Sequence, residues 1–204
     1  SGERVLEAGC GAGAVLLMAA FRRPGASFMG LERDQDALDL TQTNIALNDV
    51  QDRVSARYGD VLNACEGEPF DAVLANPPFF DDESSLRGPA PAKRAAWIAE
   101  GGLAAWVDFL TRAVREGGTV TMIHRAERLG DLLGLLARRA GSFQIRPVHP
   151  FADAPANRVL ARAIRGGRAP LKLLPPLVLH PRKGPKHTPE AEAILRGEAS
   201  IDWD

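Results

Sequence analysis

The chain has little cysteine and no long hydrophobic run. Its two cysteines, Cys10 and Cys65, argue against a disulfide framework and favour a reducing, cytoplasmic location. No apolar stretch approaches the ~18 residues that a membrane-spanning helix needs, so we expect no membrane partner. The four histidines, at positions 124, 149, 180 and 187, lack ligand spacing, and no metal site is predicted.

The composition that remains is that of a globular domain. The 204 residues are 45% hydrophobic and 25% charged, which is enough to build one sizeable core. The chain begins at Ser1 and not at a methionine. We therefore expect an N-terminal segment to be missing from this sequence.

Acidic residues are absent between Asp153 and Glu190. The same stretch carries eight basic residues, which leaves 17 basic residues against all 26 acids in the rest of the chain. These eight are Arg158, Arg162, Arg165, Arg168, Lys172, Arg182, Lys183 and Lys186. A local basic surface of this kind could contact phosphates, or it could be a solvated face without a partner.

Apolar runs and amphipathic stretches alternate along the chain, which is typical of an α/β sheet. Strands are predicted at residues 4–8, 27–32, 54–58, 70–75, 119–124, 143–148 and 158–164. Helices are predicted at residues 12–22, 34–48, 97–116, 127–140 and 189–196, with an exposed loop at 81–94 and a short element at 177–179. We expect a doubly wound, mostly parallel sheet with helices on both faces and ligands at the carboxyl ends of its strands.

A glycine-rich turn follows the first predicted strand and opens a helix. Its sequence is Glu7-Ala8-Gly9-Cys10-Gly11-Ala12-Gly13, and glycines let the backbone turn sharply and a ligand approach closely. The spacing differs from the Gly-x-Gly-x-x-Gly of dinucleotide sites and lacks the Gly-Lys-Ser/Thr of a P-loop. It therefore favours a nucleoside over a pyrophosphate ligand. The alternative is a purely structural turn.

Acidic residues lie at the ends of the next two strands. Glu32, about 20 residues past the turn, can accept hydrogen bonds from both hydroxyls of a ribose. Asp60 can accept from an adenine amine, while the Val61 N–H donates to a ring nitrogen. Each alone could be an ordinary strand-end acid or turn. The glycine-rich turn, Glu32 and the Asp60-Val61 pair lie at three successive strand ends, in the order that a nucleoside needs. Together they predict a nucleoside cofactor.

The fourth predicted strand ends in the tetrad Asn76-Pro77-Pro78-Phe79. The two prolines stop the strand and remove two N–H donors, which leaves backbone carbonyls free to accept. Asn76 adds a side-chain carbonyl, and Phe79 adds a flat face on which a base can stack for about 1–3 kcal/mol. The tetrad therefore suits an exocyclic amine on a planar group.

Together these motifs resemble the class I S-adenosylmethionine methyltransferases that modify planar nitrogens. Residues 5–13, 32, 59–61 and 75–80, with the tail at 179–193, resemble the bacterial tRNA (valine) adenine-37 N6-methyltransferase family over essentially the whole chain. The resemblance implies a Rossmann-like sheet with an antiparallel last strand. It also implies S-adenosylmethionine as cofactor and tRNA as the RNA partner. We expect a monomer or a homodimer.

The resemblance also implies roles for individual residues. Cofactor contacts are expected at Glu7, Gly9, Gly11, Gly13, Glu32, Arg33, Asp60, Val61 and Asn76. Catalytic contacts to the target base are expected at Asn76, Pro77 and Phe79. Further substrate contacts are expected at Pro78, Phe80, Arg87, Lys93, Arg94, Arg182, Lys183 and Lys186. We expect residues 1–165 to form the methyltransferase domain, with 166–204 as a basic, proline-rich extension packed on it.

Other interpretations fit the same motifs. Protein glutamine N5-methyltransferases and DNA adenine methyltransferases carry a similar tetrad, although the former usually have Tyr where this chain has Phe79. A cofactor-binding module without turnover would explain the glycine turn but not the tetrad. The resembled family also has a segment before its first strand that helps enclose the cofactor, and this chain begins almost at that strand.

Overall fold

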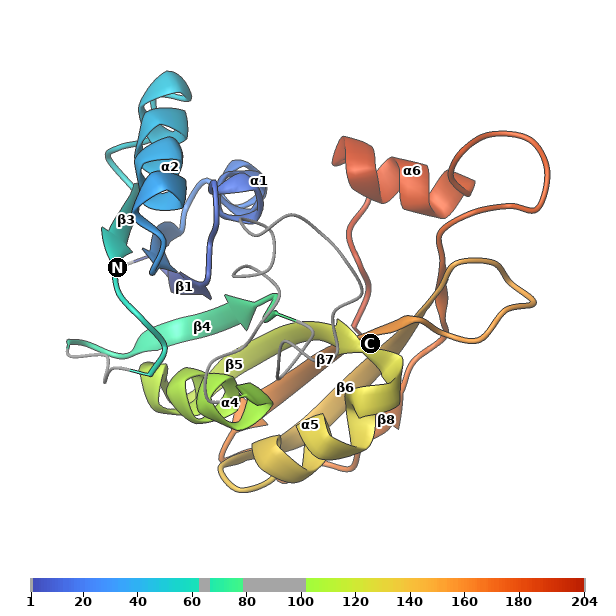
Figure 1. Ribbon diagram of the computed structural model, residues 1–204. Helices are drawn as coiled ribbons and strands as arrows, with labels where there is room; N and C mark the ends of the chain where they lie inside the picture. Colours follow the sequence, from blue (N-terminus) through green and yellow to red (C-terminus); the bar gives the residue numbers. More distant parts are fainter. Residues whose placement is uncertain (1, 63–66, 79–101, 204) are drawn as a thin grey trace.

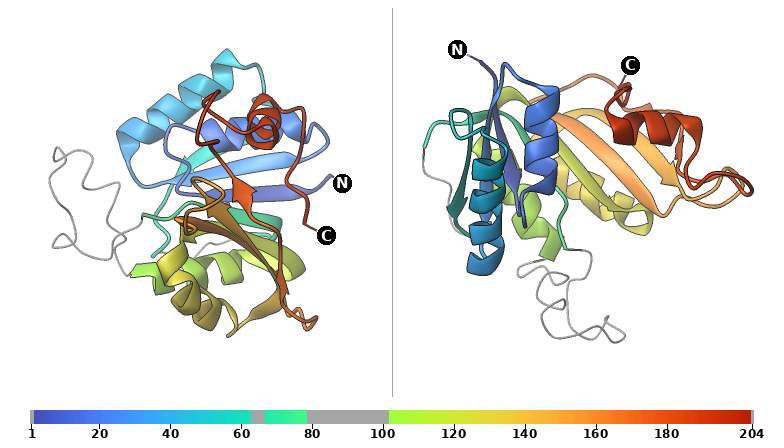
Figure 2. Two further views of the ribbon diagram at one scale, coloured as in Figure 1. Left: turned by 90° about the vertical axis from the view of Figure 1, so that its right-hand side faces the viewer. Right: turned by 90° about the horizontal axis from the view of Figure 1, so that it is seen from above.

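The computed structural model describes residues 2–62, 67–78 and 102–203. Its strands are β1 (Arg4–Ala8), β2 (Ser27–Glu32), β3 (Val54–Tyr58), β4 (Phe70–Ala75), β5 (Val114–Arg125), β6 (Ala140–His149), β7 (Arg158–Arg165), β8 (Lys172–Leu173) and β9 (Leu177–Val178). Its helices are α1 (Ala14–Arg22), α2 (Gln35–Leu47), α4 (Gly102–Ala113), α5 (Leu129–Leu136) and α6 (Pro189–Arg196). Helices α1, α2 and α6 lie on one side of the sheet, and α4 and α5 lie on the other (Figures 1 and 2).

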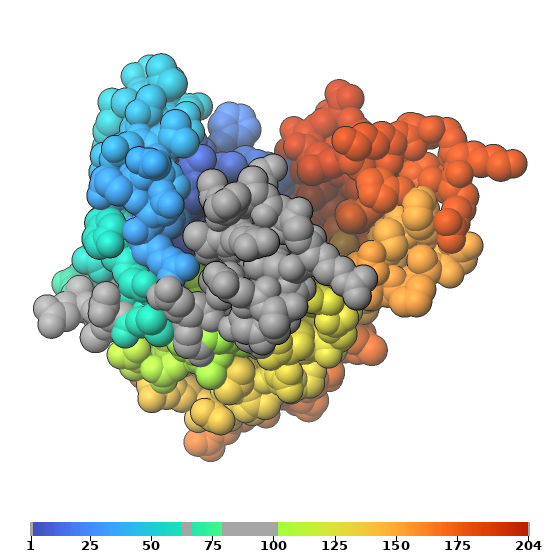
Figure 3. Space-filling view, viewed as in Figure 1, coloured from blue at the N-terminus to red at the C-terminus, as the bar shows by residue number. Residues whose placement is uncertain are grey.

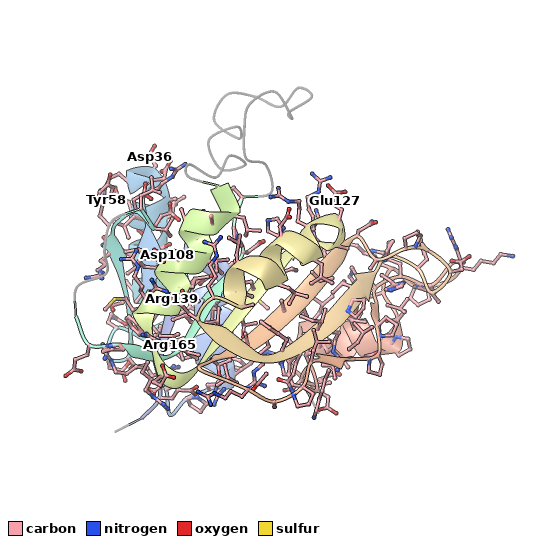
Figure 4. The ribbon with its side chains drawn as sticks, turned by 90° about the horizontal axis from the view of Figure 1, so that it is seen from below. Asp36, Tyr58, Asp108, Glu127, Arg139 and Arg165 are labelled. Carbon is pink, nitrogen blue, oxygen red and sulfur yellow. The ribbon has the colours of Figure 1, made fainter. Side chains whose placement is uncertain are left out.

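One mixed sheet organises the molecule, in the order β3-β2-β1-β4-β5-β7-β6-β8, with β9 also paired to β6. The strands from β3 to β5 in this order pair in parallel, whereas β7 is antiparallel to both β5 and β6. The predicted doubly wound, mostly parallel sheet with an antiparallel late strand is confirmed. Because β6 is parallel to β5, the carboxyl ends of β1 to β6 all lie at one edge of the sheet, which we call the carboxyl edge. Asp36, Tyr58 and Glu127 mark it in Figure 4, and Arg165 lies at the opposite edge.

Local sequence signals explain where the helices begin. Helix α2 starts after Asp34, whose Oδ1 accepts from the Ala37 N–H at 3.0 Å, as an N-cap does. Helix α6 starts after Thr188, which accepts from the Ala191 N–H at 3.2 Å, with Pro189 at its first position. Both helices were predicted at these places.

The predicted boundaries of two helices, and of the strands that follow them, are wrong. The helix expected at 97–116 ends at Ala113, and β5 begins at Val114 rather than at 119; residues 97–101 lie outside the described ranges. Val114 is fully buried and pairs with Phe70, and a register shift then carries the strand past Gly117 and Gly118. The helix expected at 127–140 is a 3-10 turn at Ala126–Arg128 followed by the shorter α5, and β6 begins at Ala140.

The main core lies between the sheet and the pair α4 and α5. Leu6, Leu110, Met122 and Leu132 are each 0% exposed there, and burying one such side chain contributes about 1.5–3 kcal/mol. A second cluster, which includes Val5, Leu16 and Ile45, joins the other face to α1 and α2. Among the described residues, no helix has both the length and the apolar character needed to cross a membrane.

The residues after 165 contact both the sheet and α1. Strands β8 and β9 extend the sheet beside β6. Arg22 of α1 donates to the Ile194 carbonyl and, at 2.9 Å, to the Ala199 carbonyl. Gln144 and Arg146 of β6 donate to the carbonyls of Trp203 and Asp202. Helix α6 therefore lies on the same side of the sheet as α1 (Figure 2).

Phe109→Ala tests the importance of the main core. Phe109 is 1% exposed, so removing its ring should lower the free energy of unfolding by about 3–5 kcal/mol. Phe21, on the surface of α1, is 82% exposed, and Phe21→Ala should change it by only about 0.5 kcal/mol. Urea denaturation measures both, and equal losses would contradict this account of the core.

Candidate active site

The glycine turn at residues 9–13 is built from left-handed backbone. Gly9, Gly11 and Gly13 have φ values of 70°, 54° and 83°, which other residues rarely adopt. A Cβ at Gly9 would lie 2.7 Å from the Trp106 ring, and one at Gly13 would lie 2.9 Å from Cγ2 of Thr41. A Cβ at Gly11 would meet nothing within 4 Å. The turn is therefore packed against Trp106 at Gly9 and against Thr41 at Gly13, and it has open space at Gly11.

Helix α2 holds the centre of this turn. Thr41 Oγ1 donates to the Gly11 carbonyl at 2.5 Å, and Asn44 Nδ2 donates to the Ala12 carbonyl at 2.9 Å. Thr41 is 0% exposed. Sequence reasoning did not assign a site role to either residue. The signal that could have found Thr41 is a hydroxyl on the otherwise apolar face of the predicted helix.

Glu32, at the end of β2, is joined to the same turn. Its Oε2 accepts from the Gly11 N–H at 2.8 Å, and its Oε1 accepts from the N–H groups of Arg33 and Asp34, both at 2.9 Å. The side chain is 9% exposed. A carboxylate offers about four lone-pair sites. Glu32 therefore keeps capacity for a ligand hydroxyl while it fixes the turn.

Glu7, at the end of β1, is a buried carboxyl with an unsatisfied oxygen. It is 4% exposed, and among the described residues no donor reaches its Oε2. Burial raises the pKa of Glu7 to about 8, and the charge of Glu32 adds to the rise, whereas the Leu16 backbone N–H opposes it. An orphaned buried acceptor beside an open glycine turn fits a cationic ligand, and S-adenosylmethionine carries both an ammonium and a sulfonium group.

The loop after β3 lies beside the end of β2. The Gly59 N–H donates to the Glu32 carbonyl at 2.9 Å, and Asp60 Oδ2 lies 3.6 Å from Nη1 of Arg33. Asp60 Oδ1 accepts from the Leu62 N–H at 2.9 Å, and Val61 is 8% exposed. The predicted contacts at Glu32, Arg33, Asp60 and Val61 therefore lie together.

The tetrad begins next to the glycine turn. Ala75 pairs with Ala8 in parallel, so Asn76 and Gly9 leave neighbouring strands about 4.8 Å apart. The Asn76 side chain is exposed, Pro77 is buried and Pro78 is half-buried. The remaining predicted contacts in this part of the chain, Phe79, Phe80, Arg87, Lys93 and Arg94, lie outside the described residues.

The predicted basic surface is divided between two edges of the sheet. Because β7 is antiparallel, Arg158 begins it at the carboxyl edge and Arg165 ends it at the opposite edge. Arg168 and Lys172 lie at the opposite edge too, near residues 141–144 of β6. Arg182, Lys183 and Lys186 follow β9, beyond β6, and are not part of the cluster around the glycine turn.

Cys10 packs inside the turn. It is 6% exposed, and a Cβ on Gly30 would lie 2.7 Å from its Sγ. Burial raises the pKa of the Cys10 thiol to about 11, so it stays protonated at neutral pH and is not a nucleophile. In the described part of the chain, no group of His, Cys, Asp and Glu side chains is placed to hold a metal ion.

Thr41→Val should loosen the turn. The variant keeps the shape of the side chain but loses the donor to Gly11, which should cost about 1 kcal/mol of stability and weaken S-adenosylmethionine binding several-fold. Thr41→Ser keeps the hydroxyl and should retain most of the affinity. Calorimetric titration of the three proteins measures this, and equal affinities of the Val and Ser variants would contradict it.

Glu7→Gln should change how stability depends on pH. The folded-state pKa of about 8 lies above the ordinary value of 4.5, so the folded protein holds a proton that the unfolded chain releases between these values. Its free energy of unfolding therefore falls as the pH rises through this window. Glutamine does not titrate, so its variant lacks this loss of stability. The melting temperature of the variant, minus that of the wild type, should therefore increase from about pH 5 to about pH 8. Parallel curves would contradict the assignment.

Known proteins are similar to this chain in sequence. Residues 1–88 match the family model described as methyltransferase small domain. A tRNA1(Val) (adenine(37)-N6)-methyltransferase of Vibrio cholerae is 28% identical over 160 residues, covering 76% of this chain and 65% of the relative. A ribosomal protein uL3 glutamine methyltransferase of Bradyrhizobium diazoefficiens is 26% identical over 137 residues, covering 63% and 43%. The chain thus spans less than two thirds of the length of either relative.

A solved structure extends the likeness to nearly the whole chain. The predicted O-methyltransferase Atu636 of Agrobacterium tumefaciens superposes with a TM-score of 0.79 at 25% identity, covering 98% of this chain and 91% of that one. The family match over residues 1–88 includes the glycine turn, Glu32, Asp60 and Asn76. Residues 1–88 are therefore similar to the methyltransferase small domain family, and the fold of nearly the whole chain is that of a solved protein described as a predicted O-methyltransferase.

Proposed function

We propose that the chain is an N-methyltransferase that transfers a methyl group to the N6 amine of an adenine in tRNA. The observation that carries this proposal is the parallel pairing of Ala8 with Ala75. A ligand bound at the glycine turn and a planar amine bound at Asn76 would then be neighbours, as methyl transfer requires. The relative that modifies adenine 37 of a tRNA supports the choice of acceptor.

Several residues are suited to hold the cofactor. When bound, S-adenosylmethionine supplies a methyl group that is activated by its positive sulfur. Gly11 leaves open space at the centre of the turn, and Glu32 would accept from a ribose hydroxyl. Asp60 and Val61 would bind the adenine ring. The unpartnered oxygen of Glu7 would accept a hydrogen bond from the cofactor ammonium, with Gly9, Gly13 and Arg33 completing the surroundings.

The tetrad would prepare the acceptor amine. The amine of adenine is a poor nucleophile because its lone pair is delocalised into the ring. If Asn76 Oδ1 and the Pro77 carbonyl accept its two N–H hydrogens, the nitrogen becomes pyramidal and its lone pair is free to attack. As the N–C bond formed, the bond from the methyl group to sulfur would break and S-adenosylhomocysteine would leave. The cationic nitrogen would then release one of these protons to solvent, so no strong base is needed beforehand. Catalysis would then come from positioning and preorganised acceptors.

An adenine within RNA must leave its stack to reach such a site, and this is easiest in a single-stranded loop. Pro78, Phe79 and Phe80 are the proposed contacts of the unstacked base. The sequence also places Arg87, Lys93 and Arg94 shortly after the tetrad, and we propose them as phosphate contacts.

A protein substrate is the second candidate. The likeness to a ribosomal protein uL3 glutamine methyltransferase favours it, because a glutamine amide is also a planar group with an NH₂. Both substrates would use Asn76 and Pro77 in the same way. Side-by-side methyl transfer to unmodified tRNA and to purified uL3 distinguishes them, and N6-methyladenosine among the digested nucleosides identifies the first.

Asn76→Ala should abolish transfer with little effect on cofactor binding. Removing one preorganised polar group from a reacting centre typically costs about 100-fold or more in rate. Transfer of labelled methyl groups to unmodified tRNA should fall by that amount, while the dissociation constant of S-adenosylmethionine changes little. Asn48→Ala, at the end of α2, is the matched control. Full activity of the Asn76 variant would refute the proposed role.

A further inference from the structure

The loop at residues 181–187 stands on the carboxyl edge of the sheet. It follows β9, which runs parallel to β6 and pairs Val178 with His149. The N–H groups of Leu179 and His180 donate to the carbonyls of His149 and Pro150, both at 2.9 Å. This part of the chain projects from the right-hand side of the molecule in Figure 3.

The tetrad lies on the same edge. Strands β5, β7 and β6 separate β4 from β9, so four strand spacings, or about 19 Å, lie between the ends of β4 and β9. A few nucleotides next to a base held at Asn76 could cover this distance along the edge. The distance therefore suits a contact with the RNA that flanks the target base.

Arg182 is already engaged within the protein. Its Nε and Nη2 both lie 2.9 Å from Oδ1 of Asp153, and its guanidinium lies 4.1 Å from the centre of the Phe151 ring. The hydrogen bond from Arg182 holds the pKa of Asp153 below its usual value. Arg182 therefore ties the loop to the β6–β7 connection, and the substrate contact expected of it from the sequence stays a prediction.

The other end of the loop is also tied. Nδ1 of His180 lies 2.7 Å from the Lys186 carbonyl oxygen, and the His180 and His187 rings stack with their centres 5.5 Å apart. Nδ1 of His187 lies 3.0 Å from the Glu192 carboxylate. These contacts hold the backbone while the side chains of Lys183 and Lys186 stay exposed. Neither lysine has an ion-pair partner among the described residues.

We infer that the loop at residues 181–187 is a docking surface for RNA phosphates next to the target base, with Lys183 and Lys186 as its contacts and Phe151 and Asp153 as positioning residues. The inference rests on the proposed RNA substrate. Two lysines on an anchored loop match two phosphates without reading sequence. Two nearby acids are already paired, Asp153 with Arg182 and Glu192 with Arg196.

The chain offers a matched control for charge alone. Arg168 and Lys172 are exposed and belong to the same acid-free segment, but they lie at the opposite edge of the sheet. The double variants K183E/K186E and R168E/K172E therefore change the net charge equally. Only their positions relative to the tetrad differ.

The first experiment measures tRNA binding by the two double variants over a range of salt concentrations. K183E/K186E should weaken binding at least 10-fold at low salt and reduce the salt slope by about 2, because about one unit is lost per phosphate contact. R168E/K172E should leave the slope close to the wild-type value. Both variants should bind S-adenosylmethionine as the wild type does. Equal losses of RNA binding in the two variants would overturn the docking surface.

The second experiment separates positioning from charge. Asp153→Asn removes a negative charge, so charge alone predicts tighter RNA binding. If Asp153 positions the loop through Arg182, the variant should instead bind tRNA about 3-fold more weakly, in keeping with the modest strength of an exposed ion pair. Its melting temperature reports whether the fold is intact. Tighter binding would overturn the positioning role.

The wild-type protein distinguishes failure of this inference from failure of the proposed function. If the wild type neither binds nor methylates unmodified tRNA, the RNA substrate is wrong, and the docking surface fails with it. If the wild type methylates tRNA and K183E/K186E does so equally well, only the docking surface is wrong. If K183E/K186E loses methyl transfer to purified uL3 but keeps methyl transfer to tRNA, the docking surface is likewise overturned.

Discussion

The glycine turn between β1 and α1 is the constraint on which the site depends. Three left-handed residues within five positions bring the backbone N–H of Gly11 to Glu32 and its carbonyl to Thr41. A side chain at such a φ costs about 1–2 kcal/mol, and at Gly9 or Gly13 it would also collide with Trp106 or Thr41. The turn therefore fixes the positions of β2, α2 and α4 relative to one another before any ligand binds.

Glu7 shows what this arrangement costs. Its backbone belongs to a buried parallel strand, so its carboxyl enters the protein with an oxygen that finds no donor among the described residues. A buried polar group without a partner destabilises the fold. Violations of this kind are expected at functional sites. The cost is consistent with a group whose partner is a ligand cation rather than a protein donor.

The sequence predicted those parts of the site that depend on strand ends. Glycine, proline and acidic residues stop strands locally, so the positions of Glu32, Asp60 and Asn76 could be read from neighbours in the chain. The roles of Thr41 and Asn44 could not, because their partners lie about thirty residues away, in the glycine turn. The start of β5 at Val114 depends on pairing with Phe70, and β8 is too short to leave a pattern.

The division of the basic segment has the same origin and a functional consequence. Helix α5 connects β5 to β6, and β6 runs parallel to β5 but is not its neighbour in the sheet. Strand β7 lies between them and is antiparallel to both. The connection from β6 to β7 must then lie at the carboxyl edge, together with Phe151 and Asp153. Along β7, Arg158 lies at the carboxyl edge and Arg165 at the opposite edge. Arg182, Lys183 and Lys186 follow β9 and lie at the carboxyl edge, which also holds Asn76. The direction of one strand thus decides which basic residues share an edge with the tetrad.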